Sequence, residues 1–286
     1  MEAAAAFPWW VWPIALAAVG FVIGVVAVLA GIGGGVLFVP IVGSFFPFHL
    51  DFVRGAGLLF ALAGTLAAGP KLLRSGMASL RLVMPLGLAG SICSVAGAIV
   101  GLGMQADLLQ ILLGALVVAI AFVIWLTRGS EGGIVDPDSL ARLLKLEGRF
   151  HDPADGRHID WKTHRTLLGF VAFGAIGFLG GVFGLGAGFA NVPALNLLMA
   201  APLKVAVGSS ALIISIINSS AAWVYINRGA VLPMLVVPSI LGVMLGSRLG
   251  ARLLESVPAR QVRWLVIVVM LLAGARALLR GTGIWI

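Results

Sequence analysis

The sequence predicts an all-α polytopic membrane protein built from two inverted repeats, and three observations lead to this fold class. Apolar residues make up 60% of the 286 residues and charged residues only 10%, whereas a soluble globular domain carries roughly 25% charged residues. The mean hydropathy is +1.11, and the apolar residues gather in long segments. In addition, a glycine-rich stretch that ends in proline occurs twice, at Gly31–Pro40 and at Gly184–Pro193.

Each repeat is expected to contain one glycine-broken helix pair, re-entrant or discontinuous, and three further membrane helices. The apolar segments cover residues 9–46, 52–73, 80–104 and 107–127, and then 166–200, 204–226, 230–254 and 260–280. A single helix over the first segment would measure roughly 57 Å at 1.5 Å per residue, against about 30 Å for the hydrocarbon core of a bilayer. The first and fifth segments are therefore expected to break at their glycines. Such a break is tolerated within a membrane only where it is buried in protein or lines a cavity.

The two glycine-rich stretches match at an offset of 153 residues (184 − 31), and the same offset aligns residues further along the chain. The matching pairs are Gly76 and Gly229, Pro85 and Pro238, Ser94 and Ser247, and Gly97 and Gly250. One register thus serves both the break and the later helices, which indicates an internal duplication. We divide the chain into an N-terminal membrane repeat (1–127), a loop insert (128–165) and a C-terminal membrane repeat (166–286).

The distribution of lysine and arginine favours inverted repeats over parallel ones. Cytoplasmic loops of membrane proteins carry an excess of these residues. If each broken segment turns back on itself, 15 of the 19 lie inside and 4 outside, whereas a single crossing gives 13 and 6. We therefore expect a multi-pass protein of the cell inner (plasma) membrane, with the central loop in the cytoplasm and both termini outside. The net charge of +8 follows from this topology, so no nucleic-acid partner is expected.

The central loop is expected to carry a short helix and a β-hairpin. Asp136–Ser139 supplies helix-start residues, and the leucines within Leu140–Leu146 give an amphipathic helix that Gly148 ends. Residues 148–152 and 156–161 resemble the two arms of a hairpin. The loop is therefore predicted to form a small cytosolic structure.

Neither a metal, another cofactor nor an enzymatic activity is expected. Three histidines lie in the central loop, at His151, His158 and His164, but their spacing matches no ligand pattern, so a solvated surface is favoured. The glycine-rich stretches fit neither the dinucleotide fingerprint nor the P-loop, and no zincin or serine-hydrolase motif is present. A purely structural membrane protein would account for packing glycines but not for two broken segments in register.

The two broken segments predict a site for a small anion between them, because interrupted membrane helices at matching places mark transporter sites. N–H groups at the N-termini of half-helices carry partial positive charge, and glycine lets an oxyanion approach the backbone. The predicted substrate-binding residues are Gly33, Gly34, Gly35, Gly186, Ala187, Gly188, Asn191, Asn196, Ser209, Ser210 and Asn218. The alternative is helix packing, since closely spaced glycines and Ser or Asn side chains also hold membrane helices together.

Arg54 and Lys204 complete the predicted substrate-binding set. They follow the two broken segments at near-equivalent places and are expected to attract the anion from opposite sides. Charges inside a bilayer are costly and usually functional, although long side chains near span ends also reach the headgroups. No Asp or Glu lies in mid-span, so no proton relay is apparent. An inside-negative potential alone moves a monovalent anion outward with about 2.3 kcal/mol per 100 mV.

The duplicated glycine-rich segment followed by Val-Pro, here Gly31–Pro40 and Gly184–Pro193, resembles the TauE/SafE sulfite exporter family, also grouped as toluene-sulfonate uptake permeases. Similar features are Lys204–Ser210 after the second break and Asn227–Gly229 before the seventh segment. The resemblance covers the chain apart from its central loop. It implies a bilayer protein that exports small sulfur-containing anions such as sulfite, sulfoacetate or other organosulfonates. Another small anion, channel-like passage, uptake instead of export, and the oligomeric state stay open.

Overall fold

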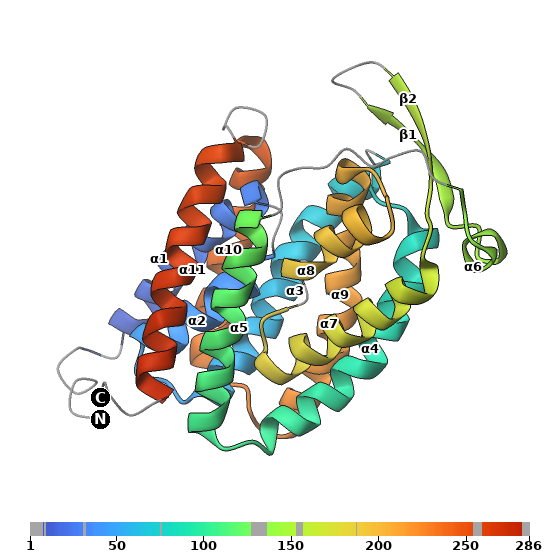
Figure 1. The fold of residues 1–286 in the computed structure, drawn as a ribbon. Coiled ribbons are helices and arrows are strands. Elements are labelled where there is room, and N and C mark those ends of the chain that lie inside the picture. Colours follow the sequence, from blue (N-terminus) through green and yellow to red (C-terminus); the bar gives the residue numbers. More distant parts are fainter. Residues whose placement is uncertain are drawn as a thin grey trace.

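Long apolar helices dominate the structure, and the predicted all-α polytopic architecture is confirmed (Figure 1). The computed structural model describes residues 8, 10–30, 33–74, 76–126, 136–152, 157–186, 188–253 and 259–281. In these parts, six helices are long and apolar enough to cross a membrane: α1 (Val11–Ala30), α3 (Leu50–Arg74), α4 (Leu80–Leu102), α7 (Thr166–Phe183), α9 (Leu203–Asn227) and α10 (Pro233–Leu253). Two further long helices, α5 (Ala106–Leu126) and α11 (Ala259–Gly281), pack against each other at one side of the bundle.

The first and fifth apolar segments are each interrupted at their glycines. Helix α1 ends at Ala30 and α2 (Gly35–Phe45) follows; α7 ends at Phe183 and α8 (Gly188–Pro193) follows, running directly into the π-helical turn η2 (Ala194–Leu198). Gly33 and Gly186 occupy the same place in the two interruptions and have φ angles of +73° and +70°. Glycine adopts this left-handed conformation without steric cost, whereas a residue with a Cβ is strained there.

The first helix of each repeat packs against the other repeat. Helix α1 lies along α10, and its equivalent α7 lies along α4. Glycine lets these backbones approach closely: a Cβ at Gly24 would lie 2.8 Å from the carbonyl oxygen of Val243. The equivalent pair at the offset of 153 residues, Gly177 and Gly90, is closer still. The same contact is therefore made twice, with the roles of the two repeats exchanged.

Equivalent helices of the two repeats run in opposite directions where they meet. Near the start of α3, Gly55 lies against Tyr225, which is close to the end of α9. Further along α3, the hydroxyl oxygens of Thr65 and Ser215 are 2.9 Å apart. Contacts closer to the C-terminus of α3 are therefore made with residues closer to the N-terminus of α9, so the two helices are antiparallel. Helices α5 and α11 pack in the same antiparallel sense.

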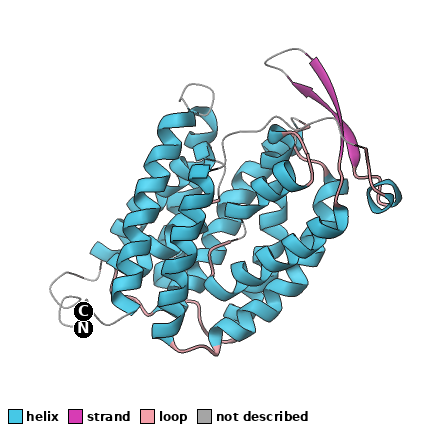
Figure 2. Cartoon of the chain, viewed as in Figure 1, coloured by secondary structure: helices cyan, strands magenta, loops and turns pink. Residues whose placement is uncertain are grey.

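The central loop contains the predicted helix and hairpin, and the hairpin is the β-structure of the described chain (Figure 2). Strands β1 (Glu147–Asp152) and β2 (Arg157–Lys162) pair in antiparallel register, with Gly148 opposite Trp161. Their turn lies outside the described residues. The hairpin projects from the helical bundle at the end where α7 begins (Figure 1).

The predicted helix of the central loop is shorter than expected. Helix α6 covers Ser139–Leu143 and does not continue to Gly148. The chain turns at Lys145, whose φ is +51°, and thereby buries Leu146 at 1% exposure in the core cluster that includes Trp161. Gly148 already belongs to β1, where a Cβ would meet the Trp161 ring. Burial of one leucine therefore ends the helix before the glycine does.

Asp138, at the N-terminus of α6, ties the central loop to α7. Its carboxylate accepts hydrogen bonds from the Thr166 hydroxyl (2.7 Å) and the Thr166 backbone N–H (3.2 Å). Partial burial raises the pKa of the Asp138 carboxyl, but the hydrogen bonds outweigh this effect and the pKa lies below its ordinary value of 3.8. The charged carboxylate therefore stabilises the junction between loop and membrane helix.

Adding a methyl group at the crowded glycines should destabilise both exchanged helix pairs. We expect Gly24→Ala and Gly177→Ala each to lower the unfolding free energy by about 1–3 kcal/mol, because the new Cβ overlaps a backbone carbonyl. The control is Gly69→Ala, whose Cβ would sit 3.4 Å from a Leu212 methyl, an ordinary contact. The measurement is thermal unfolding in detergent. Equal stability of all three variants would contradict the packing described above.

Removing the Asp138 carboxylate should loosen the central loop. We expect Asp138→Ala to make trypsin cleave the loop several-fold faster, since a hydrogen bond to a charged group contributes about 1.5–3 kcal/mol. Because the folded-state pKa is lowered, the stabilisation is present above pH 3.8 and is lost as the pH falls through the folded-state pKa. Asp136→Ala, which changes an exposed carboxylate nearby, is the control and should leave cleavage unchanged.

Candidate functional site

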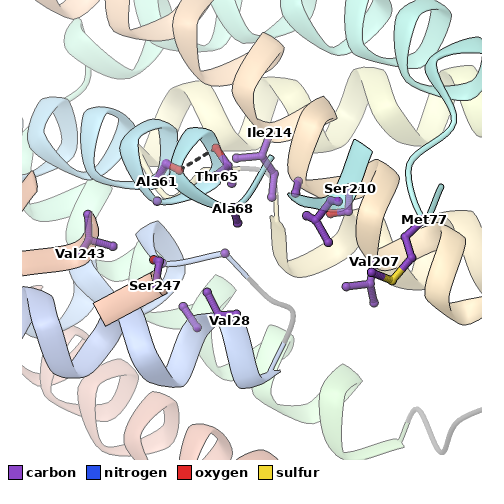
Figure 3. A pocket seen from close by; sticks show the side chains of 16 residues that line it. Val28, Ala61, Thr65, Ala68, Met77, Val207, Ser210, Ile214, Val243 and Ser247 are labelled. Atoms are coloured by element: carbon purple, nitrogen blue, oxygen red, sulfur yellow. Dashed lines mark hydrogen bonds between the residues drawn. The ribbon is translucent and has the colours of Figure 1, made fainter. Parts of the chain in front are cut away.

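A cavity of about 190 Å³ lies where the first interruption faces α3, α9 and α10 (Figure 3). Its wall includes Gly33 and Gly34 at the interruption, Ala61 and Thr65 on α3, and Ser210 on α9. A cavity of this size has room for several waters or one small organic anion. The cavity extends along α3 as far as Leu72 and Met77, which are both half-buried. It thus reaches towards the end of the bundle from which the hairpin projects.

The two interruptions meet beside this cavity. A Cβ at Gly33 would lie 3.4 Å from the Cα of Gly188 and 3.3 Å from a methyl group of Ile214 on α9. A Cβ at Gly186 would lie 2.9 Å from Asn218 Nδ2 and 3.0 Å from the Cβ of Ala61 on α3. The predicted glycines are therefore brought together between α3 and α9. Ala187 lies outside the described residues.

Three polar side chains near the interruptions are buried without a hydrogen-bond partner among the described residues. They are Asn191, Asn218 and Ser210, which are at most 1% exposed. Ser210 lines the cavity, and Asn218 lies against Gly186. A buried polar group without a partner costs about 1–3 kcal/mol, and such groups require an explanation. A bound ligand or water that accepts and donates hydrogen bonds would supply one.

The two other predicted polar residues hold the backbone together instead. Asn196 Nδ2 donates to the carbonyl oxygen of Ala201 at 2.9 Å, which closes the turn after η2. Ser209 Oγ accepts a hydrogen bond at 3.1 Å from the backbone N–H of Ser79, at the N-terminus of α4. Both side chains are thus occupied by structural hydrogen bonds and neither lines the cavity.

The predicted cations lie away from the cavity. Arg54 is fully buried near the start of α3 and donates hydrogen bonds to Asp51 and to carbonyl oxygens of α4 and α7. Lys204 is exposed in the first turn of α9. In the register of 153 residues, Arg54 pairs with Val207 and Lys204 pairs with Asp51, so the two cations are not direct counterparts.

The cavity wall carries no charged side chain among the described residues. Its polar side chains are Thr65, Ser210 and Ser247, and the rest is glycine and apolar residues. Thr65 Oγ1 donates to Ala61 O at 2.9 Å and also contacts Ser215 (Figure 3). An anion here would be held by backbone N–H groups and neutral dipoles, while its organic part would contact apolar side chains.

Sequence reasoning missed Thr65 and Ser247. The duplication held the signal for Thr65, because Thr65 occupies the register position of Asn218 (218 − 65 = 153); Ser247 pairs with Ser94, which was not a predicted site residue. A polar residue in the middle of a membrane helix is therefore itself a candidate site residue when its equivalent in the other repeat is a predicted site residue. The apolar lining gave no comparable signal, since most residues of the chain are apolar.

The chain is similar to known proteins over most of its length. A family model described as "Sulfite exporter TauE/SafE" matches residues 16–277. A curated relative from Bacillus subtilis (strain 168), named "Probable membrane transporter protein YunE", is 29% identical over 119 residues. This match covers 42% of the chain and 44% of the relative, so it spans less than half of that relative's length. No solved structure gives a significant match.

Replacing Asn218 by leucine should abolish transport without loss of stability. The change removes a polar group that has no partner among the described residues, and such a replacement is close to neutral or stabilising. We expect at least a tenfold loss of flux in proteoliposomes and an unchanged or raised unfolding temperature. Asn227→Leu, at the exposed end of the same helix, is the matched control and should retain flux.

A structural role for Asn218 would give a different pattern. The leucine variant would then lose stability, and flux would fall only in proportion to the amount of folded protein. The same comparison applies to Asn191→Leu, because Asn191 is equally buried and also has no partner in the described part of the chain.

Proposed function

This chain belongs to the TauE/SafE sulfite exporter family, and from this premise we propose that it exports small sulfur-containing anions, of the sulfite or organosulfonate type, across the cell inner membrane. The anion occupies the cavity between the two interrupted helix pairs. Neither an enzymatic reaction nor a cofactor is part of the proposal. The alternatives are another small anion as substrate, and uptake instead of export.

The observation that carries the proposal is the meeting of the two interruptions at a cavity. Gly33 and Gly186 turn the chain at equivalent places, and Gly33 packs against Gly188 of the other repeat. The N-terminus of α2 begins at this point, where the first N–H groups of a helix have no intrahelical partner and favour an anion. The unpartnered Asn218 and Ser210 are suited to complete the coordination of the anion's oxygens.

The apolar wall favours an organosulfonate over the bare sulfite ion. Several branched or long apolar side chains line the cavity, among them Val28, Leu72, Met77, Val207 and Ile214. An ion that is hydrated on all sides would lose water there without gaining partners, whereas a sulfonate with a carbon chain can place its charge at the N–H groups and its carbon atoms against the wall. We therefore expect a sulfonate with a short organic group to be transported better than sulfite.

Inverted repeats are supported by the antiparallel contacts between equivalent helices. Helices α3 and α9 run in opposite directions where they touch, as do α5 and α11. If α3 crosses the membrane, its counterpart then crosses in the other direction, which is the relation found in many transporters. This arrangement gives 15 basic residues on the side of the central loop and 4 on the other, so we propose that the loop is cytoplasmic and the termini face outward.

The membrane potential suffices to drive export of a monovalent anion. A potential of 100 mV contributes about 2.3 kcal/mol per charge, which corresponds to a concentration ratio of about fifty. No carboxylate or histidine lines the cavity in the described part of the chain, so the proposal assigns no proton relay to it. The direction of net transport then follows the potential and the substrate gradient.

Flux measurements in proteoliposomes test the proposed function. We expect a small organosulfonate with an uncharged carbon chain to move faster than sulfite, and also faster than sulfoacetate, whose carboxylate would meet the apolar wall. Each anion should move faster when the potential is negative on the side from which it leaves. Sulfate, thiosulfate, taurine and acetate complete the panel, and protein-free liposomes and the Asn218→Leu variant serve as controls. Transport of a cation alone, or equal flux in protein-free liposomes, would overturn the proposal.

A further inference from the structure

Arg54 connects three helices at the end of the bundle where α3 begins, opposite to the end that the cavity approaches. Its guanidinium donates to Gly101 O (3.2 Å) near the end of α4, to Val182 O near the end of α7, and to Asp51 Oδ1 (2.7 Å) on its own helix. The last carbonyl groups of a helix lack intrahelical partners and carry partial negative charge. One cation thus satisfies the ends of two parallel helices from different repeats.

Tyr225 on α9 adds a fourth helix to this cluster. The guanidinium carbon of Arg54 lies 5.3 Å from the centre of its ring, and the Tyr225 hydroxyl donates to Gly181 O at 3.0 Å. Arg54 and Tyr225 are both fully buried, whereas the Asp51 side chain is 35% exposed. The Arg54–Asp51 pair therefore lies at the boundary between the protein interior and the surface.

The fold itself does not require an arginine at this position. In the second repeat the equivalent residue is Val207, which lines the cavity at the other end of the bundle. Both repeats build the same helix arrangement, but only the first carries the cation. A buried charge within a membrane helix is costly and usually functional. The difference between Arg54 and Val207 therefore points to a difference between the two ends of the transport route.

Arg54 lies between the cavity and a second pocket at the surface. Along α3, Ala61 at the cavity is seven residues from Arg54, or about 10 Å. The intervening layer is closed, because a Cβ at Gly57 would lie 2.6 Å from Gly184 O and Leu58 is fully buried. Beyond Asp51, a pocket of about 420 Å³ opens between the start of α3 and the end of α9, and includes Arg228.

We propose that the Arg54–Asp51 pair is the latch that closes the transport route on the face that carries Arg228. While Arg54, oriented by Asp51 of the same helix, holds the ends of α4 and α7 against α3, the cavity communicates with the opposite face only. Opening towards Arg228 requires these helix ends to separate from α3, and the arginine then gives up its carbonyl partners. Arg54 is a positioning residue in this proposal and does not bind the anion in the closed arrangement. The proposal rests on the proposed transport function, but its test does not depend on the identity of the substrate.

Thiol accessibility from each face of the membrane tests the latch. Cys93 is the single cysteine of the chain, so Cys93→Ser provides the background. Ala68→Cys places one thiol in the cavity wall, and Arg228→Cys, made separately, identifies the face in the same vesicles. A membrane-impermeant thiol reagent is applied to right-side-out and to inverted vesicles, and the labelling rate of the cavity thiol is measured.

We expect the cavity thiol to react from the face opposite to Arg228 while the latch is intact. Asp51→Asn, which weakens the pair at a half-exposed position, should raise its labelling rate from the Arg228 face at least tenfold, and Arg54→Gln should do the same. Arg74→Gln, an exposed arginine at the other end of α3, is the matched control and should leave the rate unchanged. Labelling from the Arg228 face that is equally slow in Asp51→Asn and in the background would overturn the latch, even if Arg54→Gln fails to fold. If no anion is transported but the cavity thiol is labelled faster in the latch variants, the latch is supported and the proposed transport function is overturned.

Discussion

Backbone groups inside a membrane have to find hydrogen-bond partners within the protein, and this constraint governs the structure. Two apolar segments are interrupted halfway, at Gly33 and at Gly186, and each interruption releases N–H and C=O groups from helical hydrogen bonding. The interruptions are buried between α3 and α9 and face each other. The surrounding helices enclose them, and the cavity lies where this enclosure leaves space.

The duplication supplies a common scaffold, and substitutions within it distinguish the two halves. Thr65 and Asn218 occupy equivalent positions beside the two interruptions. Thr65 is hydrogen-bonded, whereas Asn218 has no partner among the residues that the structure describes. Arg54 and Val207 are also equivalent, but one is a buried cation and the other lines the cavity. Equivalent positions of the two repeats therefore occupy corresponding places in their helices, but they carry side chains of different chemistry.

The elements with strong local signals could be predicted from the sequence. The helices follow from long apolar segments, and the hairpin follows from two short strands around a turn. The central helix ended early because burial of Leu146 decided its length, and a tertiary contact of this kind leaves no local signal. The repeat register aligned Gly33 with Gly186 and contained the clue to Thr65.

The roles of individual polar residues could not be predicted in this way. Ser209 and Ser210 are neighbours of the same type, yet one accepts a hydrogen bond from α4 and the other lines the cavity, because successive residues of a helix point about 100° apart. Asn196 and Asn218 lie on different elements, and only Asn196 finds a partner among the described residues, the carbonyl oxygen of Ala201. The two carbonyl partners of Arg54 lie 47 and 128 residues away in the chain, so its burial is a property of the assembled bundle.

The exchange of first helices between the repeats has a consequence for biosynthesis. Helix α1 finds its main partner, α10, more than 200 residues further along the chain, and α4 finds α7 only after the central loop has been made. A ribosome thus releases the first repeat before either of its principal interfaces can form. The helices made first therefore remain in the bilayer without these partners, and the interrupted segments become fully enclosed only when translation is nearly complete.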